Sequence, residues 1–114
     1  MSIDFTILGI TDDWEHISMG FGASPSPQTL IHHFHIPPRV LAIQATRTDN
    51  SGSADTAMIS GSLGGLEFVP LSAITLSSSM VAYTTIIDKP VRNVKAIVRS
   101  TSIGGMTLQI LGMK

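Results

Sequence analysis

The sequence predicts an all-β protein: a jelly-roll-like antiparallel β-sandwich of about eight short strands. Three observations favour this class. Apolar and polar residues alternate over short segments, turn-forming residues separate these segments about every 8–12 residues, and no segment carries the apolar stripe of an amphipathic helix. The chain has 114 residues, which fits one domain, residues 1–114, around one core.

The first third of the chain predicts three strands. Residues 3–9 and 15–21 each place apolar side chains at alternate positions. Residues 22–27 form a loop, because two prolines so close together do not fit a central ladder. Residues 29–36 are a third strand, which Pro37-Pro38 ends. The residues expected on one face of each strand are Ile3, Phe5 and Ile7; Glu15, Ile17, Met19 and Phe21; and Leu30, His32, Phe34 and Ile36.

The middle of the chain predicts further short strands. Residues 39–46 are dominated by apolar side chains and read as a strand. Residues 49–53, Asp-Asn-Ser-Gly-Ser, are a strong turn signal. Residues 54–60 fit either a strand or a single helical turn. Gly64-Gly65 predicts a tight hairpin, from which residues 67–69 return.

The last third has the clearest alternation. Asp88-Lys89-Pro90 and Gly104-Gly105 predict turns. The predicted strands in this part are residues 74–76, 80–87, 91–99 and 106–111. In the third of these, one face carries Val94, Ala96 and Val98, and the other carries Asn93, Lys95 and Arg99. We therefore expect an apolar core face and a polar outward face on this strand.

Composition excludes several function classes. Charged residues make up 13% of the chain and the net charge is −1, so no basic excess favours nucleic acid. Polarity comes instead from 14 serine and 11 threonine residues, and a charge-poor surface suits contact with neighbours. The chain has no cysteine, which excludes disulfides and thiolate sites. We expect no signal peptide, since Met1 to Asp4 lack a positive start, and no membrane span, since no apolar run approaches ~20 residues.

His33 and His35 are weak candidates for a metal site. On a strand, residues at i and i+2 emerge on the same face about 7 Å apart, so two imidazoles could reach one metal ion. Cupin-type jelly rolls use a similar His-x-His followed by Glu, but here the following residues run to Arg39 without a carboxylate. Three chains converging on an axis could also build a six-nitrogen site. We expect ordinary strand histidines, and no metal or cofactor.

A carboxylate cluster, Asp12-Asp13-Trp14-Glu15, stands before the second strand. Three acids within four residues could bind Ca²⁺ or form an acid–base pair, but the cluster lacks the spacing of an EF-hand. We expect a solvated turn. Trp14, the only tryptophan, is expected to anchor the core or an interface, and we assign it to partner binding. As a platform for stacking sugars it has no second aromatic beside it in the sequence.

The polar face of residues 91–99 is the other candidate contact surface. Asn93, Lys95 and Arg99 could meet an acidic surface on a partner. The alternative is an edge strand that charge keeps soluble. The glycine pairs lack a following Lys-Ser/Thr or helix, so they are turns and not phosphate loops, and no Gly-x-Ser-x-Gly elbow is present. We therefore expect no enzyme activity.

The second half of the chain carries a recognisable order of residues. It runs through Gly61-Ser62-Leu63-Gly64-Gly65-Leu66-Glu67-Phe68-Val69-Pro70-Leu71, then Tyr83, Pro90-Val91-Arg92, residues 94–98, Gly104-Gly105 and residues 106–111. This order resembles the C-terminal half of many small bacteriophage virion structural proteins. It departs from their pattern where Phe68 stands for Trp, Gly64 for Asp and Val91 for Phe.

The resemblance implies a virion location and a non-enzymatic structural role. It implies first a capsid decoration (cement) protein that stabilises the phage head, and second a tail, neck or fibre component. The implied partners are the major capsid protein or other virion proteins, and further copies of the chain, often as a trimer. Two alternatives come from other classes. A carbohydrate-binding β-sandwich module would need more exposed aromatics, and a cupin-like metal protein would need the missing Glu.

Overall fold

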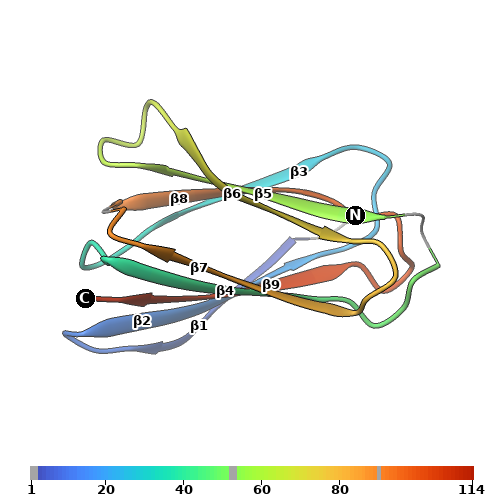
Figure 1. Cartoon of the computed structure of the whole chain (residues 1–114), viewed down its shortest axis with the longest axis horizontal. Coiled ribbons are helices and arrows are strands. Elements are labelled where there is room, and N and C mark those ends of the chain that lie inside the picture. Colours follow the sequence, from blue (N-terminus) through green and yellow to red (C-terminus); the bar gives the residue numbers. More distant parts are fainter. Residues whose placement is uncertain (1–2, 52–53, 90) are drawn as a thin grey trace.

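The computed structural model describes residues 3–51, 54–89 and 91–114. These residues form nine strands in two antiparallel sheets, stacked face to face (Figure 1). The strands are β1 (Ile3–Ile10), β2 (Trp14–Phe21), β3 (Gln28–His33), β4 (Val40–Thr46), β5 (Asp55–Ser62), β6 (Val69–Leu76), β7 (Val81–Ile87), β8 (Asn93–Arg99) and β9 (Met106–Met113). The described residues contain no helix long and apolar enough to span a bilayer.

The strand order is that of a jelly roll with one strand added. The five-stranded sheet runs β1-β2-β9-β4-β7 and the four-stranded sheet runs β3-β8-β5-β6. From β2 to β9 the chain forms one long hairpin: β5 pairs with β6 at its tip, then β4 with β7, β3 with β8 and β2 with β9. The pairs β4–β9 and β5–β8 roll this hairpin into two sheets. β1 is extra and pairs with β2.

Alternation along the strands fills the space between the sheets, as the sequence predicts. Each inward face supplies every second residue, and the largest fully buried side chains are Phe34, Ile17, Met19, Leu41, Ile43, Ile59, Leu76, Met106, Leu108, Ile110, Val94 and Val98. At about 25 cal/mol per Å² of apolar surface, burial of each such side chain stabilises the fold by about 1.5–3 kcal/mol. The predicted core face of residues 91–99, with Val94, Ala96 and Val98, is confirmed.

Several predicted boundaries are wrong. The third strand ends at His33 and not at residue 36, because the chain bends at residues 35 and 36 before Pro37-Pro38. Residues 54–60, left open between strand and helix, belong to β5. Residues 67–69 and 74–76 are not separate strands: β6 runs from Val69 to Leu76. It tolerates Pro70 because it is an edge strand with an irregular register opposite Ile59 and Ser60.

Two predicted turns lie partly outside the described residues. Of the turn predicted at residues 49–53, the structure describes residues 49–51. Of the turn predicted at residues 88–90, it describes residues 88 and 89. Asp49 joins its turn to the Gly104-Gly105 turn, because its Oδ2 accepts the Gly104 N–H at 2.8 Å. Hydrogen bonds from Ser51 and then from Gly104 lower the pKa of Asp49 to about 2. The predicted turn at Gly104-Gly105 is confirmed, with φ of 72° at Gly105.

Candidate functional site

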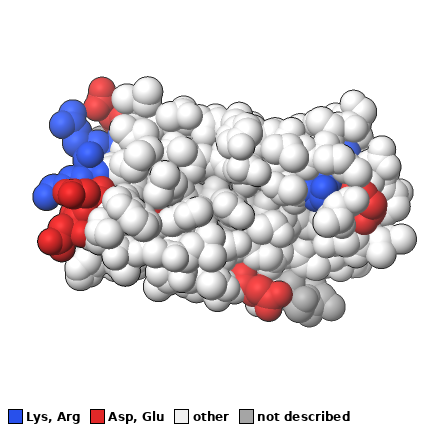
Figure 2. Space-filling view, turned by 90° about the horizontal axis from the view of Figure 1, so that it is seen from below, with Lys and Arg blue, Asp and Glu red and all other residues white. Residues whose placement is uncertain are grey.

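The outward surface of the five-stranded sheet, here called the outer face, is almost free of charge. The strand register sets its outward residues of β2, β9, β4 and β7 in four rows. The rows are Trp14, Met113, Val40 and Ile87; His16, Leu111, Ala42 and Thr85; Ser18, Gln109, Gln44 and Tyr83; and Gly20, Thr107, Thr46 and Val81. Figure 2 shows this surface as a broad uncharged area with Lys, Arg, Asp and Glu at its margins. When β1 is added to these four strands, Asp4 on β1 is the only outward residue of the described sheet that carries a formal charge.

Charged groups gather where several connections meet, at one end of the sandwich. The Lys114 N–H donates to the Asp13 carbonyl at 2.8 Å, and the Arg39 N–H donates to the Met113 carbonyl at the same distance. These bonds hold the C-terminus, the β1–β2 turn and the start of β4 together. Arg39 also pairs with Asp88 at 3.1 Å, although both side chains are exposed, so this ion pair contributes little to stability.

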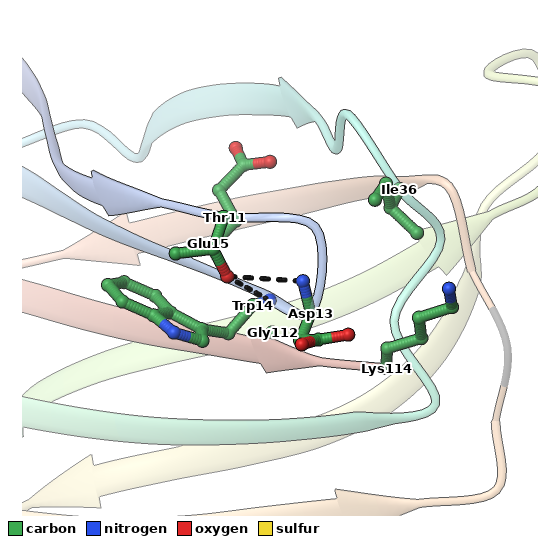
Figure 3. A pocket seen from close by; sticks show the side chains of 7 residues that line it. All are labelled: Thr11, Asp13, Trp14, Glu15, Ile36, Gly112 and Lys114. Atoms are coloured by element: carbon green, nitrogen blue, oxygen red, sulfur yellow. Dashed lines mark hydrogen bonds between the residues drawn. The ribbon is translucent and has the colours of Figure 1, made fainter.

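Trp14 lies at one corner of the outer face and is 40% exposed. The Thr11 hydroxyl accepts the backbone N–H groups of Asp13 and Trp14 at 3.1 and 3.2 Å, which fixes the turn before β2. Figure 3 shows these bonds, with the Trp14 and Glu15 side chains on opposite sides of the sheet. The indole lies across Gly9 of β1, where a Cβ atom would stand 2.6 Å from the ring. Because Gly9 has no side chain, the indole of Trp14 can lie against the backbone of β1.

A second aromatic lies on the same face. Tyr83 on β7 is 75% exposed and stands three strands from Trp14, roughly 20 Å away by strand spacing and rise. Two shallow grooves connect them. One, of about 520 Å³, runs beside Trp14, and the other, of about 210 Å³, runs beside Tyr83; His16 and Leu111 line both. The sequence offered no sign of this pairing, because it follows from the β2-β9-β4-β7 order.

Neutral polar groups lie between the two aromatics. His16 Nε2 and Gln109 Oε1 are 3.3 Å apart, and Gln44 donates to the Thr46 hydroxyl at 3.2 Å. Amide, imidazole and hydroxyl groups can both donate and accept hydrogen bonds without a net charge. The outer face can therefore bind a flat, uncharged partner surface or a neutral polar ligand.

The free edge of β1, here called the β1 edge, is the second exposed apolar feature. β1 pairs with β2 on one side, and no other described strand pairs with it on the other. Ile3, Phe5 and Ile7 point to the core side of the sheet, because their partners Phe21, Met19 and Ile17 are buried. They nevertheless stay exposed, since the four-stranded sheet ends at β3 and does not extend over β1. The His32 ring lies beside them, with its centroid 5.1 Å from that of Phe5.

A buried polar pair lies beside this edge. Glu15 points inward, as its predicted parity requires, and pairs with His32. Its other oxygen accepts the His35 N–H at 3.0 Å, and the Phe34 ring packs edge-on against the His32 ring. Glu15 therefore does not belong to a solvated turn. The cavity nearby has room for about 10 Å³, the space of about one water molecule, so we assign this pair to structure.

His33 and His35 do not share the strand geometry that the metal hypothesis needs. β3 ends at His33, and His35 lies in the bend that follows. Both ring nitrogens of His33 already have protein partners: Nδ1 lies 2.7 Å from Asn93 Oδ1, and Arg92 Nε donates to Nε2 at 3.1 Å. Among the described residues, no three His, Cys, Asp or Glu side chains cluster as metal ligands would. The expectation that this pair holds no metal stays an untested prediction.

The three residues of the predicted polar docking face of β8 differ in their exposure to solvent. Asn93 is only 7% exposed and bonds to His33, which corrects the expectation that its side chain is free for a partner. Lys95 is half-buried, and its Nζ lies 4.6 Å from the centroid of the Phe68 ring, a cation–π contact. Arg99 is exposed, beside a groove with Met58 and Ile97. A partner role for Trp14, Lys95 and Arg99 stays a prediction.

A buried ion pair, which the sequence did not indicate, joins the β4–β5 connection to the first residue of β5. Arg47 Nη1 donates to Asp55 Oδ2 at 3.3 Å, and both side chains are fully buried. Arg47 Nε also donates to the Ser79 carbonyl at 3.0 Å, and Asp55 Oδ1 accepts the Thr101 N–H at 3.1 Å. Burial by itself raises the pKa of Asp55. Hydrogen bonds from Ser102 and Thr101, together with Arg47, outweigh burial and hold that pKa below its ordinary value.

Comparison with known proteins places the fold. No protein-family model and no curated protein matches the chain. Among solved structures, a protein of the disulfide-linked pili that form Bacillus endospore appendages is 12% identical, with a TM-score of 0.54, 99% of this chain covered and 91% of that one. PirA is 12% identical, with a TM-score of 0.50 and coverage of 96% and 100%.

A part of bacteriophage CBA120 tailspike protein 4 is similar at 10% identity and a TM-score of 0.49, covering 99% of this chain and 18% of that one. At such low identities these likenesses concern the fold alone. The chain is an antiparallel β-sandwich with a jelly-roll order of strands, the predicted fold class.

Proposed function

We propose that the chain is a non-enzymatic structural protein of a virion, a decoration protein that binds the outside of a phage capsid and stabilises the head. The observation that carries this proposal is the outer face, a surface without Lys, Arg or Glu that presents Trp14 and Tyr83. Interface cores are depleted of charge and enriched in aromatic side chains. A soluble surface that serves no contact usually mixes charges of both signs.

The size of the outer face suits a modest interface. Five strands about 4.8 Å apart and seven residues of about 3.3 Å each cover roughly 24 by 23 Å, or about 550 Å². Covering this area on both partners would bury about 1,100 Å², just above the ~1,000 Å² expected of a specific contact. Such a protein would hold to a particle through many copies, each bound weakly, as decoration of a repeating lattice requires.

The major capsid protein is the partner that this proposal names first, and a tail, neck or fibre is the second location. The fold likeness to a pilus protein is compatible with a role in an external assembly. The resemblance of residues 61–111 to virion proteins supports the phage assignment. Localisation is accordingly the virion.

The proposal is tested on purified particles from the source. Mass spectrometry should find the chain in many copies per particle, and added protein should sediment with particles that lack it. Trp14→Ala should weaken binding to the particles at least tenfold, as measured by co-sedimentation. Ile103→Ala is the matched control, because Ile103 is exposed in the turn after β8, away from the outer face. Absence from particles, or equal binding by both variants, would refute the capsid role.

A carbohydrate-binding module is a second candidate, which one specific observation favours. Trp14 lacks an aromatic neighbour in the sequence, but the fold sets Tyr83 on the same face with His16, Gln44 and Gln109 between them. Aromatic faces and neutral hydrogen-bonding groups suit the faces and hydroxyls of an uncharged sugar chain. Retention on an array of neutral glycans, lost in both Trp14→Ala and Tyr83→Ala, would support this role over capsid binding. A blank array would remove it.

A further inference from the structure

β1 is exposed along almost its entire length, yet it is strongly apolar. It supplies none of the buried core residues, and its residues are exposed except for the half-buried Gly9. Ile3, Phe5, Ile7, Leu8 and Ile10 are all large apolar side chains in contact with solvent. Proteins usually protect a free edge with charges, prolines or a covering loop. β1 has one charge, Asp4, and no proline.

We propose that β1 pairs with β1 of a second copy, antiparallel and about a two-fold axis at Phe5. This would join two five-stranded sheets into one continuous ten-stranded sheet. The proposal goes beyond the capsid role, because it concerns a different surface from the outer face. It also names the first contact between copies as a two-fold one, so a trimer would need a separate contact.

The register follows from the strand itself. With Phe5 opposite Phe5, Ile3 lies opposite Ile7 and Asp4 opposite Thr6. An even register keeps the core-side residues of both copies on the same side of the joined sheet, whereas a one-residue slip would turn them to opposite sides. The segment from Ile3 to Ile7 is also regular, since the register with β2 shifts only between Ile7 and Gly9.

The neighbouring even registers are less favourable. An axis at Asp4 would set two carboxylates directly opposite each other, which destabilises a strand pair. An axis at Thr6 would place Asp4 opposite Leu8, inside the irregular part of β1. In the Phe5 register the Thr6 hydroxyl can instead donate to the Asp4 carboxylate of the other copy.

A second copy fits this edge better than an unrelated strand does, because the edge is self-complementary. Pairing brings together six apolar side chains, Ile3, Phe5 and Ile7 from each copy, on the side where the four-stranded sheet leaves β1 uncovered. Backbone N–H and C=O groups that now face solvent gain partners in the ladder. An edge contact of this kind lies at the small end of interface areas, so we expect a weak dimer that forms at high protein concentration.

Cross-linking tests the register directly. The chain has no cysteine, so Phe5→Cys introduces a single thiol. Residues directly opposite across a strand pair have Cβ atoms about 4.5–5.5 Å apart, close to what a disulfide needs. Mild oxidation should therefore give a covalent dimer at least ten times faster for Phe5→Cys than for Leu8→Cys. Leu8 is the matched control, because it is 51% exposed against 41% for Phe5 but lies at the irregularity.

A charge exchange tests the two-fold axis. Phe5→Lys and Phe5→Glu should each weaken dimerisation at least tenfold in sedimentation, because like charges would face each other across the axis. An equimolar mixture of the two should form a dimer again. Equal cross-linking at positions 5 and 8, or no recovery in the mixture, would overturn the proposal. The capsid role fails separately: a dimer that does not bind particles would refute that role and leave the β1 pairing standing.

Discussion

Removal of the buried charge at Asp55 gives the most quantitative prediction. Asp55→Asn keeps an oxygen for the Thr101 N–H but leaves the Arg47 guanidinium fully buried without its carboxylate. Nη2 of Arg47 already has no hydrogen-bond partner among the described residues, so little in the surroundings can compensate. Breaking a buried pair on one side costs about 3–5 kcal/mol. That is a large share of the ~5–15 kcal/mol by which a native domain is stable.

Urea unfolding at pH 7, followed by circular dichroism, measures this loss. With a slope of about 2 kcal/mol per molar urea, the midpoint should fall by roughly 1.5–2.5 M. The double variant Arg47→Met/Asp55→Asn is the control, because it removes the unpaired charge as well. It should recover most of the lost stability. A change of less than about 1 kcal/mol in Asp55→Asn would refute the reasoning, since it would mean that the pair contributes no more than an exposed one.

The pH dependence of the same variant has a defined sign. The folded-state pKa of Asp55 is lowered, so its contribution is complete above the unfolded pKa of about 3.9 and is lost as pH falls through the folded value. The stabilities of the wild type and of Asp55→Asn should therefore converge as the pH falls below about 4. Asp49, with a pKa of about 2, titrates in both proteins and cancels in the difference.

Four further variants test local features. Gly9→Ala should displace the indole of Trp14 while changing stability by less than about 1 kcal/mol, because the obstructing atoms belong to a side chain; a red-shifted tryptophan emission would show it, and an unchanged spectrum would contradict it. Gly105→Ala should cost roughly 2–4 kcal/mol in urea unfolding, since Gly105 has φ of 72° and a Cβ atom would lie 2.0 Å from a backbone carbonyl oxygen. Gly64→Ala, with open space around it, should change stability by less than about 0.5 kcal/mol. Glu15→Leu should cost about 1–3 kcal/mol because it leaves the His35 N–H and the His32 ring without their acceptor, whereas a neutral result would show that water replaces the carboxylate.

Much of the sandwich follows from the sequence because its signals are local. Alternation in residues 91–99 and the Gly104-Gly105 turn depend on a few neighbouring residues, and both are present in the structure. The strand boundaries at residues 33 and 69 were missed because tertiary contacts decide them. For example, the Phe34 N–H bonds to the Arg92 carbonyl, far along the chain, just where β3 ends.

The candidate site was less predictable, because it depends on strand order. The sequence identified Trp14, but the place of Tyr83 beside the same grooves follows from the pairing of β7 with β4 and of β4 with β9. The outward parity of Asn93 was read correctly from alternation. The burial of the Asn93 side chain could not be predicted in this way, because His33 and the 63–67 segment near it come from other parts of the chain. Alternation predicts the side of the sheet to which a side chain points, but it does not predict which other segments cover that side.

The position of β1 outside the eight-stranded jelly roll has a consequence for local stability. A strand that shares no core residues can separate from β2 without unfolding the remaining strands, so its opening free energy is set by its own ladder alone. In the monomer, native-state hydrogen exchange should therefore be fast for the amides of β1 and slow for those of β9 and β4, which lie between two neighbours. The separated strand would leave β2 as a vacant edge, which can accept the first strand of another copy in place of its own.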